Sequence, residues 1–184
     1  MTTFPTLHTP RLTLGQLEIS DIPNIVEYAG SPNIAKMLRD LPHPYAEKDA
    51  IFWLNLANQG FANQTEYIFK LGLKETNEFI GGMGLHLKKR SNKAEVGYWI
   101  GEPFWNKGYA TEALSVILKF GFEVLELNKI YATHYVKNIP SGKVMINNGM
   151  IKEGELVDDL KKDDEYLTLI QYRMTKSEYE HPKK

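Results

Sequence analysis

A chain of 184 residues with 42% hydrophobic and 24% charged residues is typical of a globular protein, and we expect a single domain over residues 1–184. The net charge of −1, and the lack of any apolar stretch near the ~20 residues that cross a bilayer, make nucleic acid and membranes unexpected partners. The absence of cysteine excludes disulfides and thiol nucleophiles, and with an N-terminus unlike a signal peptide it favours the cytoplasm.

Periodicity in the first half of the chain predicts one strand, then helices, then a hairpin. Ser20 and Asp21 are suited to cap a helix that starts near Pro23, because proline is tolerated in a first turn. Pro42 and Pro44 exclude a helix or a central strand around them. In chain order, the predicted elements are a strand at 11–17, helices at 22–30, 31–38 and 47–59, and strands at 67–73 and 79–87.

Residues 95–114 read EVGYWIGEPFWNKGYATEAL and are the most informative part of the chain. The aromatic and β-branched run 95–100 predicts a half-buried strand, which a glycine-bearing turn follows. Asn106 is predicted to cap a helix that continues to residue 125. The first turn of a helix has unpaired N–H groups at a positive dipole end and suits phosphate, and Gly108 lets a ligand approach the backbone closely.

The last part of the chain predicts a strand, a helix and two closing strands. Asn138 is predicted to cap the helix, which stops at Gly149. A solvated turn at 161–164 joins the last two strands, and the tail from 178 is expected to fray. The order of all predicted elements indicates a mixed sheet covered by helices rather than a doubly wound sheet. The predicted strands of this part lie at 130–136, 153–160 and 166–174.

The stretch from Glu95 to Leu114 resembles the acetyl-CoA loop of the GNAT acyltransferases, and more narrowly the RimJ/RimL-type branch, in which a GYW-like strand leads to a W-x-K-G-Y-A turn. Trp105 stands where the superfamily's general pattern has Gln or Arg, a departure that is usual for this branch. The opening TPRLTL and the segment VKNIPSGKVMINNGMIKEG also resemble the branch, with Met150 in place of the more common Phe. The resemblance spans nearly the whole chain and implies the GNAT fold, an α/β structure with a mostly antiparallel central sheet flanked by helices.

The resemblance implies acetyl-CoA as co-substrate and no metal, and the five histidines show no metal-ligand spacing. It implies that backbone groups of Trp99 and Ile100 hold the pantetheine arm and the thioester carbonyl, as a strand edge holds an added strand. The amides of the turn and helix start would take the pyrophosphate, and Asn138 the pantetheine, although a plain N-cap would look the same in the sequence. The residues expected to bind acetyl-CoA are Trp99, Ile100, Asn106, Lys107, Gly108, Tyr109, Ala110, Thr111, Asn138 and Ser141.

Glu95 is the first candidate for a general base, because a GNAT base carboxylate often stands on the strand that leads to the acetyl-CoA loop and acts through ordered water. The structural alternative is a glutamate paired with Lys93 or another cation. Asp158 or Asp159 is the rival base, because some RimL-like enzymes carry a carboxylate on the strand after the E-G pair.

Ser141 is the candidate acid or hydrogen-bond donor to the sulfur of CoA, in the first turn of the helix that Asn138 caps. Many GNAT enzymes use a tyrosine seven residues after that asparagine, where this chain has Met145, which has no proton to donate. Either Ser141 or solvent therefore serves the leaving group, or Ser141 only makes local hydrogen bonds at the helix start. The resemblance implies direct attack by the amine, without a covalent enzyme intermediate.

The acceptor amine must be neutral to attack. With pKa values near ~8 for an α-amine and ~10.4 for a lysine amine, deprotonation at pH 7 costs about 1.4 and about 4.6 kcal/mol, respectively. A single carboxylate therefore suits an α-amine, in agreement with the named RimJ/RimL members, which modify the N-termini of ribosomal proteins. The alternatives are a small-molecule amine, such as an amino acid, polyamine or antibiotic, and, in a different class, a non-catalytic acyl-CoA binding or sensing domain. The resemblance also allows a homodimer.

Overall fold

The computed structural model describes residues 3–39, 41–162 and 164–182. Within these residues the strands form one eight-stranded sheet in the order β1-β2-β3-β4-β5-β6-β8-β7, and neighbouring strands are antiparallel except β5 and β6. The strands are β1 (Leu7–His8), β2 (Leu12–Gln16), β3 (Glu66–Leu73), β4 (Phe79–Lys88), β5 (Lys93–Ile100), β6 (Lys129–Tyr135), β7 (Ile151–Lys162) and β8 (Glu165–Thr175). The helices are α1 (Ile22–Ala29), α2 (Pro32–Met37), α3 (Glu47–Ala62), α4 (Tyr109–Lys119), α5 (Ile139–Asn147) and α6 (Lys176–Glu180).

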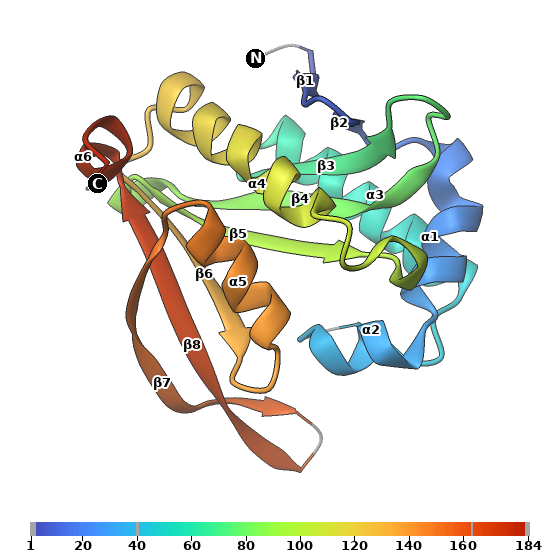
Figure 1. The fold of residues 1–184 in the computed structure, drawn as a ribbon. Helices are drawn as coiled ribbons and strands as arrows, with labels where there is room; N and C mark the ends of the chain where they lie inside the picture. Colours follow the sequence, from blue (N-terminus) through green and yellow to red (C-terminus); the bar gives the residue numbers. More distant parts are fainter. Residues whose placement is uncertain (1–2, 40, 163, 183–184) are drawn as a thin grey trace.

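Helices cover both faces of the sheet (Figure 1). Because successive strand side chains point to opposite faces, each face has its own apolar layer. The larger core packs Leu114 of α4 against Phe69 and Leu85 of the sheet. A smaller core on the opposite face packs Leu54 of α3 against Ile68. Both faces of the sheet are therefore buried at its central strands β3 and β4.

A fork between β5 and β6 interrupts the centre of the sheet (Figure 1). The two strands pair only between residues 93–95 and 129–131. β6 is paired with β8 over residues 129–135, and β5 stays paired with β4. The two strands therefore separate beyond Glu95, and the inner edges of both are left without a neighbouring strand.

The mixed, mostly antiparallel sheet expected from the sequence is confirmed, and the predicted order of the main elements is correct. The strand β1 was not predicted, since two residues offer no periodicity. The expectation of a frayed tail is wrong for residues 178–180, which belong to α6 and its reciprocal capping box of Thr175 and Glu178, in which the Thr175 N–H donates to Glu178 Oε2 at 2.9 Å, whereas 183–184 lie outside the described residues. β7 continues to Lys162, so that strand takes up part of the predicted turn, and Asp163 lies outside the described residues. In the described ranges no helix is long and apolar enough to cross a membrane.

Candidate active site

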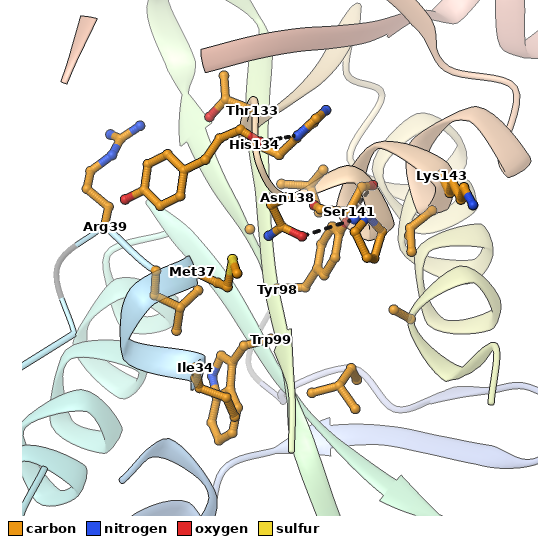
Figure 2. Close-up of a pocket in the computed structure, with 18 of the residues that line it drawn as sticks. Ile34, Met37, Arg39, Tyr98, Trp99, Thr133, His134, Asn138, Ser141 and Lys143 are labelled. Atoms are coloured by element: carbon orange, nitrogen blue, oxygen red, sulfur yellow. Dashed lines mark hydrogen bonds between the residues drawn. The ribbon is translucent and has the colours of Figure 1, made fainter. Parts of the chain in front are cut away.

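The fork between β5 and β6 opens into a cavity of about 790 Å³. Its lining comes from β5, from α2, from the turn before α4 and from the first turn of α5. Figure 2 shows Ile34 and Met37 of α2 on one side of β5, and Asn138 and Ser141 at the start of α5 on the other side. The cavity thus joins the stretch expected to bind acetyl-CoA to residues that are distant in the sequence.

The turn before α4 contains two residues in the left-handed conformation. Asn106 has a φ of 59° and Gly108 a φ of 80°, and α4 begins at Tyr109 with Gly108 as its N-cap. The prediction that Asn106 caps this helix is therefore wrong, because the chain needs a second tight turn at Gly108 before it can enter the helix. The Gly108 N-cap makes no side-chain hydrogen bond, so the N–H groups of the first turn of α4 are not capped by a side chain.

The N-terminal segment holds this turn in place. The Arg11 side chain donates to Glu112 in α4 at 2.7 Å and to the Lys107 carbonyl at 3.0 Å, and its guanidinium lies 4.6 Å from the centre of the Tyr109 ring. The Thr9 hydroxyl donates to the same carboxylate at 2.5 Å. Burial alone would raise the pKa of Glu112, but the hydrogen bonds from Thr9 and Arg11 and the charge of Arg11 outweigh it and lower this pKa. Charged contacts from the N-terminal segment thus help to fix the turn.

Trp105, the departure from the general GNAT pattern, closes the turn onto β5. Its indole N–H donates to the carbonyl of Ile100 at 2.5 Å. The carbonyl of Trp99 is turned the other way, toward Gly81 of β4, where a Cβ would collide with it. The Trp99 carbonyl therefore does not face the fork, which corrects the expectation that its backbone forms the inner edge. Because strand backbone groups alternate, Tyr98 and Ile100 face the fork instead.

Glu95 stands at the point where the fork opens. Its carboxylate accepts hydrogen bonds from the Tyr131 hydroxyl at 3.3 Å and the Thr133 hydroxyl at 3.4 Å, both from β6. Burial, and then the negative charge of Glu95, raise the pKa of Tyr131 to about 12, so its hydroxyl remains a donor at neutral pH. The alternative ion pair with Lys93 is not formed in the described structure, where the ammonium of Lys93 lies 5.3 Å from the centre of the Tyr131 ring.

The rival carboxylates lie elsewhere. Asp158 and Asp159 are exposed on β7, the edge strand of the sheet, and neither lines the cavity. Asp158 has a φ of 52°, at a register shift where β7 bends away from β8. Of the carboxylates predicted as a base, Glu95 is the one that faces the cavity.

Ser141 lies across the fork from β5 and contacts a tyrosine hydroxyl that sequence reasoning missed. The Asn138 side chain accepts from the Ser141 N–H at 3.3 Å, as predicted for an N-cap. The Tyr98 hydroxyl lies 2.8 Å from Ser141 Oγ and 3.0 Å from the Ser141 carbonyl, to which it donates. Burial raises the pKa of Tyr98 to about 12, although the hydrogen bond with Ser141 acts in the opposite direction. Met145, at the position where many relatives have a tyrosine, is buried in the core.

The far wall of the cavity is α2, and it was not predicted as part of the site. Glu102, in the loop after β5, accepts hydrogen bonds from Ser31 and Asn33 at the start of this helix. At the other end, Lys162 from the tip of the β7–β8 hairpin donates to the carbonyls of Ala35 and Leu38, both at 2.6 Å. A helix of six residues is thus fixed at its two ends by separate elements.

Among the polar side chains of the cavity lining that sequence reasoning missed are Arg39 beyond α2, Glu66 on β3 and His86 on β4. They lie in three different elements, and no spacing in the sequence connects them. The only available signal was strand alternation, which places Glu66 and His86 on the same face as Glu95 once the pairing of the strands is known.

Comparison with known proteins points to one family. An acetyltransferase (GNAT) domain matches residues 11–151. An uncharacterized N-acetyltransferase of Bacillus licheniformis is 34% identical over 178 residues, covering 95% of this chain and 98% of that protein. The ribosomal-protein-serine acetyltransferase of Escherichia coli is 29% identical over 93 residues, 50% of this chain and 52% of that protein. Among solved structures, a GNAT-family acetyltransferase from Bacillus anthracis matches with a TM-score of 0.83 at 25% identity, covering 94% of this chain and 99% of that chain.

Proposed function

This chain belongs to the GNAT acetyltransferase family and is an acetyl-CoA-dependent N-acetyltransferase, and we propose that its acceptor is the N-terminal α-amine of a protein or peptide. The observation that carries the proposal is the continuous cavity at the fork, which joins the turn before α4 to the carboxylate of Glu95. One end of this cavity offers backbone N–H groups to a diphosphate, and the other offers a proton acceptor to an amine.

The turn 106–108 and the first turn of α4 would hold the diphosphate of acetyl-CoA, which supplies the thioester for the reaction. Left-handed residues in a turn create concavities lined by N–H groups, and Asn106 and Gly108 are such residues on either side of Lys107. The N–H groups of Tyr109 to Thr111 add the positive end of the α4 dipole. Gly108 has no side chain, so the diphosphate can come close to the backbone.

The inner edge of β5 would hold the pantetheine arm. Beyond Glu95 this edge has no neighbouring strand, and the backbone groups of Tyr98 and Ile100 face the gap. Asn138 and Ser141 lie across the gap at the start of α5 (Figure 2). The arm would therefore run between β5 and α5, with the thioester beside the hydrogen-bonded pair of Tyr98 and Ser141.

Glu95 would act as the general base. Its carboxylate is held by two hydroxyl donors and has no cation as partner among the described residues, so it keeps its charge available for an ammonium group. It would draw a proton from the amine directly or through one water molecule. The two hydroxyls fix the orientation of the carboxylate without neutralising it.

Ser141 would donate a hydrogen bond to the sulfur as the C–S bond breaks. Its hydroxyl lies 2.8 Å from the hydroxyl of Tyr98, which also donates to the Ser141 carbonyl, and these contacts hold Ser141 at the edge of the cavity. The raised pKa of Tyr98, about 12, keeps its phenol protonated at neutral pH, so its hydroxyl remains a hydrogen-bond partner of Ser141. The pair would thus take the role of the tyrosine that this chain lacks at Met145.

The proposal of an α-amine rests on the low free-energy cost of deprotonating it, which a single carboxylate can meet. Deprotonation at pH 7 costs about 1.4 kcal/mol for an α-amine and about 4.6 kcal/mol for a lysine side chain. The α2 wall is apolar at Ile34 and Met37, and Met37 is 40% exposed, which suits the first side chain of a peptide. The similarity over half the chain to an enzyme that acts on a ribosomal protein supports the same class of acceptor.

Calorimetric titration with acetyl-CoA, followed by measurement of free thiol with a panel of amines, tests this function. The panel holds peptides with free N-termini, the same peptides with blocked N-termini and one lysine, free amino acids and polyamines. We expect binding of acetyl-CoA and thiol release only with free N-termini. Release with a polyamine or an amino acid would assign a small-molecule acceptor. Binding without release for every amine would contradict the catalytic proposal and indicate an acyl-CoA binding domain.

A further inference from the structure

Three polar side chains form a row across neighbouring strands next to the fork. Glu66 of β3 is opposite His86 of β4, and His86 is opposite Glu95 of β5. Residues directly opposite each other in antiparallel strands share a face of the sheet, with Cβ atoms about 5 Å apart. All three side chains line the cavity. The row leads from the interior of the molecule to the point where the fork opens.

Glu66 fixes the orientation of the His86 ring. His86 Nδ1 lies 3.1 Å from Glu66 Oε1. An ionised carboxylate only accepts hydrogen bonds, so Nδ1 carries the proton, and Nε2 of the neutral ring presents a lone pair. Gly60 of α3 makes room for the glutamate, since a Cβ there would lie 2.8 Å from Glu66 Cβ. The second oxygen of Glu66 is buried and makes no hydrogen bond within the described structure, so the contact of the carboxylate with His86 is made through Oε1.

The free nitrogen of His86 faces the floor of the cavity. Nε2 lies 3.7 Å from the position that a Cβ would take at Gly97, which is exposed on β5 two residues beyond Glu95. Gly97 has no side chain, so the space above it is open to a ligand. An amine that reaches the Glu95 carboxylate along this floor therefore lies within reach of a second proton acceptor.

We propose that His86, oriented by Glu66, is a second catalytic base that takes the proton from the acceptor ammonium, while Glu95 takes the proton that the nitrogen loses as the new bond forms. The inference rests on the proposed acetyl transfer. In that reaction the N–C bond forms, the C–S bond breaks, and the amine nitrogen loses two protons. The thiolate gains one proton at its sulfur, so one proton in total is released. The His86 side chain is 40% exposed and returns its proton to water.

The surroundings of His86 determine whether its ring can accept a proton. α3, which packs next to Glu66, has no charged side chain after Asp49, so the other charged groups near the ring come from the strands and from beyond α2. A protonated ring cannot accept a proton, so His86 can act as this base only in its neutral form. The groups that face this ring are Glu66 from β3, Lys88 from β4, Lys93 and Glu95 from β5, Tyr131 from β6 and Arg39 beyond α2.

The pH profile of kcat/KM in the His86→Gln variant tests the proposal. We expect kcat to fall roughly 10-fold to 100-fold, the acid limb of the profile that belongs to the ring to disappear, and the Kd of acetyl-CoA to stay unchanged. His181→Gln, at an exposed histidine after α6, is the matched control and should behave as the wild type. An unchanged kcat with an unchanged acid limb in His86→Gln would overturn the proposal.

A second measurement does not depend on turnover. Nitrogen-15 NMR of the histidine rings should show His86 with its proton on Nδ1, and a mixture of tautomers in Glu66→Gln, because an amide can present either an acceptor or a donor to Nδ1. A proton on Nε2 in the wild type would overturn the proposal. Absence of thiol release by the wild type with every amine would count against the acetyl transfer itself. In that case the tautomer of His86 still tests the proposal, because a proton on Nδ1 leaves Nε2 able to accept a proton and a proton on Nε2 does not.

Discussion

The two halves of the cavity are held together in different ways. The acetyl-CoA half consists mainly of backbone from one continuous stretch, 98–111, and the network of Thr9 and Arg11 on Glu112 fixes it from outside. The amine half consists of side chains from several elements, and its outer wall, α2, is held by the burial of Ile34 and Ala35 and by hydrogen bonds with Glu102 and Lys162 at its two ends.

Because they are held differently, the two halves should respond differently to mutation. A backbone turn that is locked by charged hydrogen bonds keeps its shape when its own side chains change, unless the backbone conformation itself is attacked. A wall held at two ends shifts when one contact is lost. We therefore expect changes in the first half to alter the binding of acetyl-CoA, and changes in the second half to alter the reaction of the amine.

Glu95→Gln gives the largest expected effect and separates the two halves most clearly. The amide oxygen can still accept from one of the two hydroxyls and the amide N–H can donate to the other, but the amide cannot accept a proton, so kcat should fall about 10²-fold to 10³-fold. The Kd of acetyl-CoA, measured by calorimetry, should not change. Asp159→Asn, on the exposed edge strand, is the control and should leave kcat unaffected. A loss of activity in Asp159→Asn with none in Glu95→Gln would transfer the base to β7.

Gly108→Val changes the backbone of the turn in the acetyl-CoA half. Gly108 has a φ of 80°, a conformation that costs a β-branched residue about 1–2 kcal/mol, and the new side chain would also crowd the diphosphate. The Kd of acetyl-CoA should rise about tenfold or more, while the acceptor KM at saturating acetyl-CoA stays near the wild-type value. Gly154→Ala is the control, since its Cβ would meet nothing within 4 Å. An unchanged Kd in Gly108→Val would contradict the assignment of this turn.

The same difference decides what the sequence could reveal. The acetyl-CoA half lies in one stretch, so the residue types of 95–114 are enough to predict the strand, the turn and the helix. The two predictions in this stretch that were wrong depend on backbone conformation. Asn106 does not cap α4, and the Trp99 carbonyl faces β4. Neither dihedral angles nor the direction of a carbonyl can be read from residue types at this turn.

The amine half depends on strand pairing, which the sequence alone does not give. Glu66 and His86 become neighbours only when β3, β4 and β5 are aligned in their observed register. The same holds for Lys162, which is 124 residues from its partner Leu38. Glu95 could be predicted because it stands on the strand that leads to the recognisable turn.

Lys162→Ala tests the end of α2 that the hairpin holds. Loss of the two hydrogen bonds to Ala35 and Leu38 frees the last turn of the helix, so the acceptor KM should rise about threefold to tenfold, as expected for a loss of roughly 1 kcal/mol. The Kd of acetyl-CoA should remain unchanged. Lys161→Ala, whose side chain reaches only Asp164 at 3.9 Å, is the matched control. An increase in the Kd of acetyl-CoA with an unchanged acceptor KM would place α2 in the other half.

Glu112→Gln gives the smallest effect and tests the lock on the acetyl-CoA half through stability. The pKa of Glu112 is lowered in the folded protein from its ordinary value of 4.5, so its carboxylate stabilises the fold above that pH. At neutral pH the variant should lose about 1 kcal/mol, since Arg11 is half exposed and its contribution is screened. As the pH falls below 4.5 and the folded carboxyl takes up its proton, this stabilisation is lost and the two proteins should converge. Urea unfolding at neutral and acid pH measures the difference in the free energy of unfolding between the wild type and the variant. Glu75→Gln, in an exposed turn, is the control. A stability difference that does not depend on pH would mean that Glu112 stabilises the turn through packing rather than through its charge, and would contradict the charged network proposed for the acetyl-CoA half.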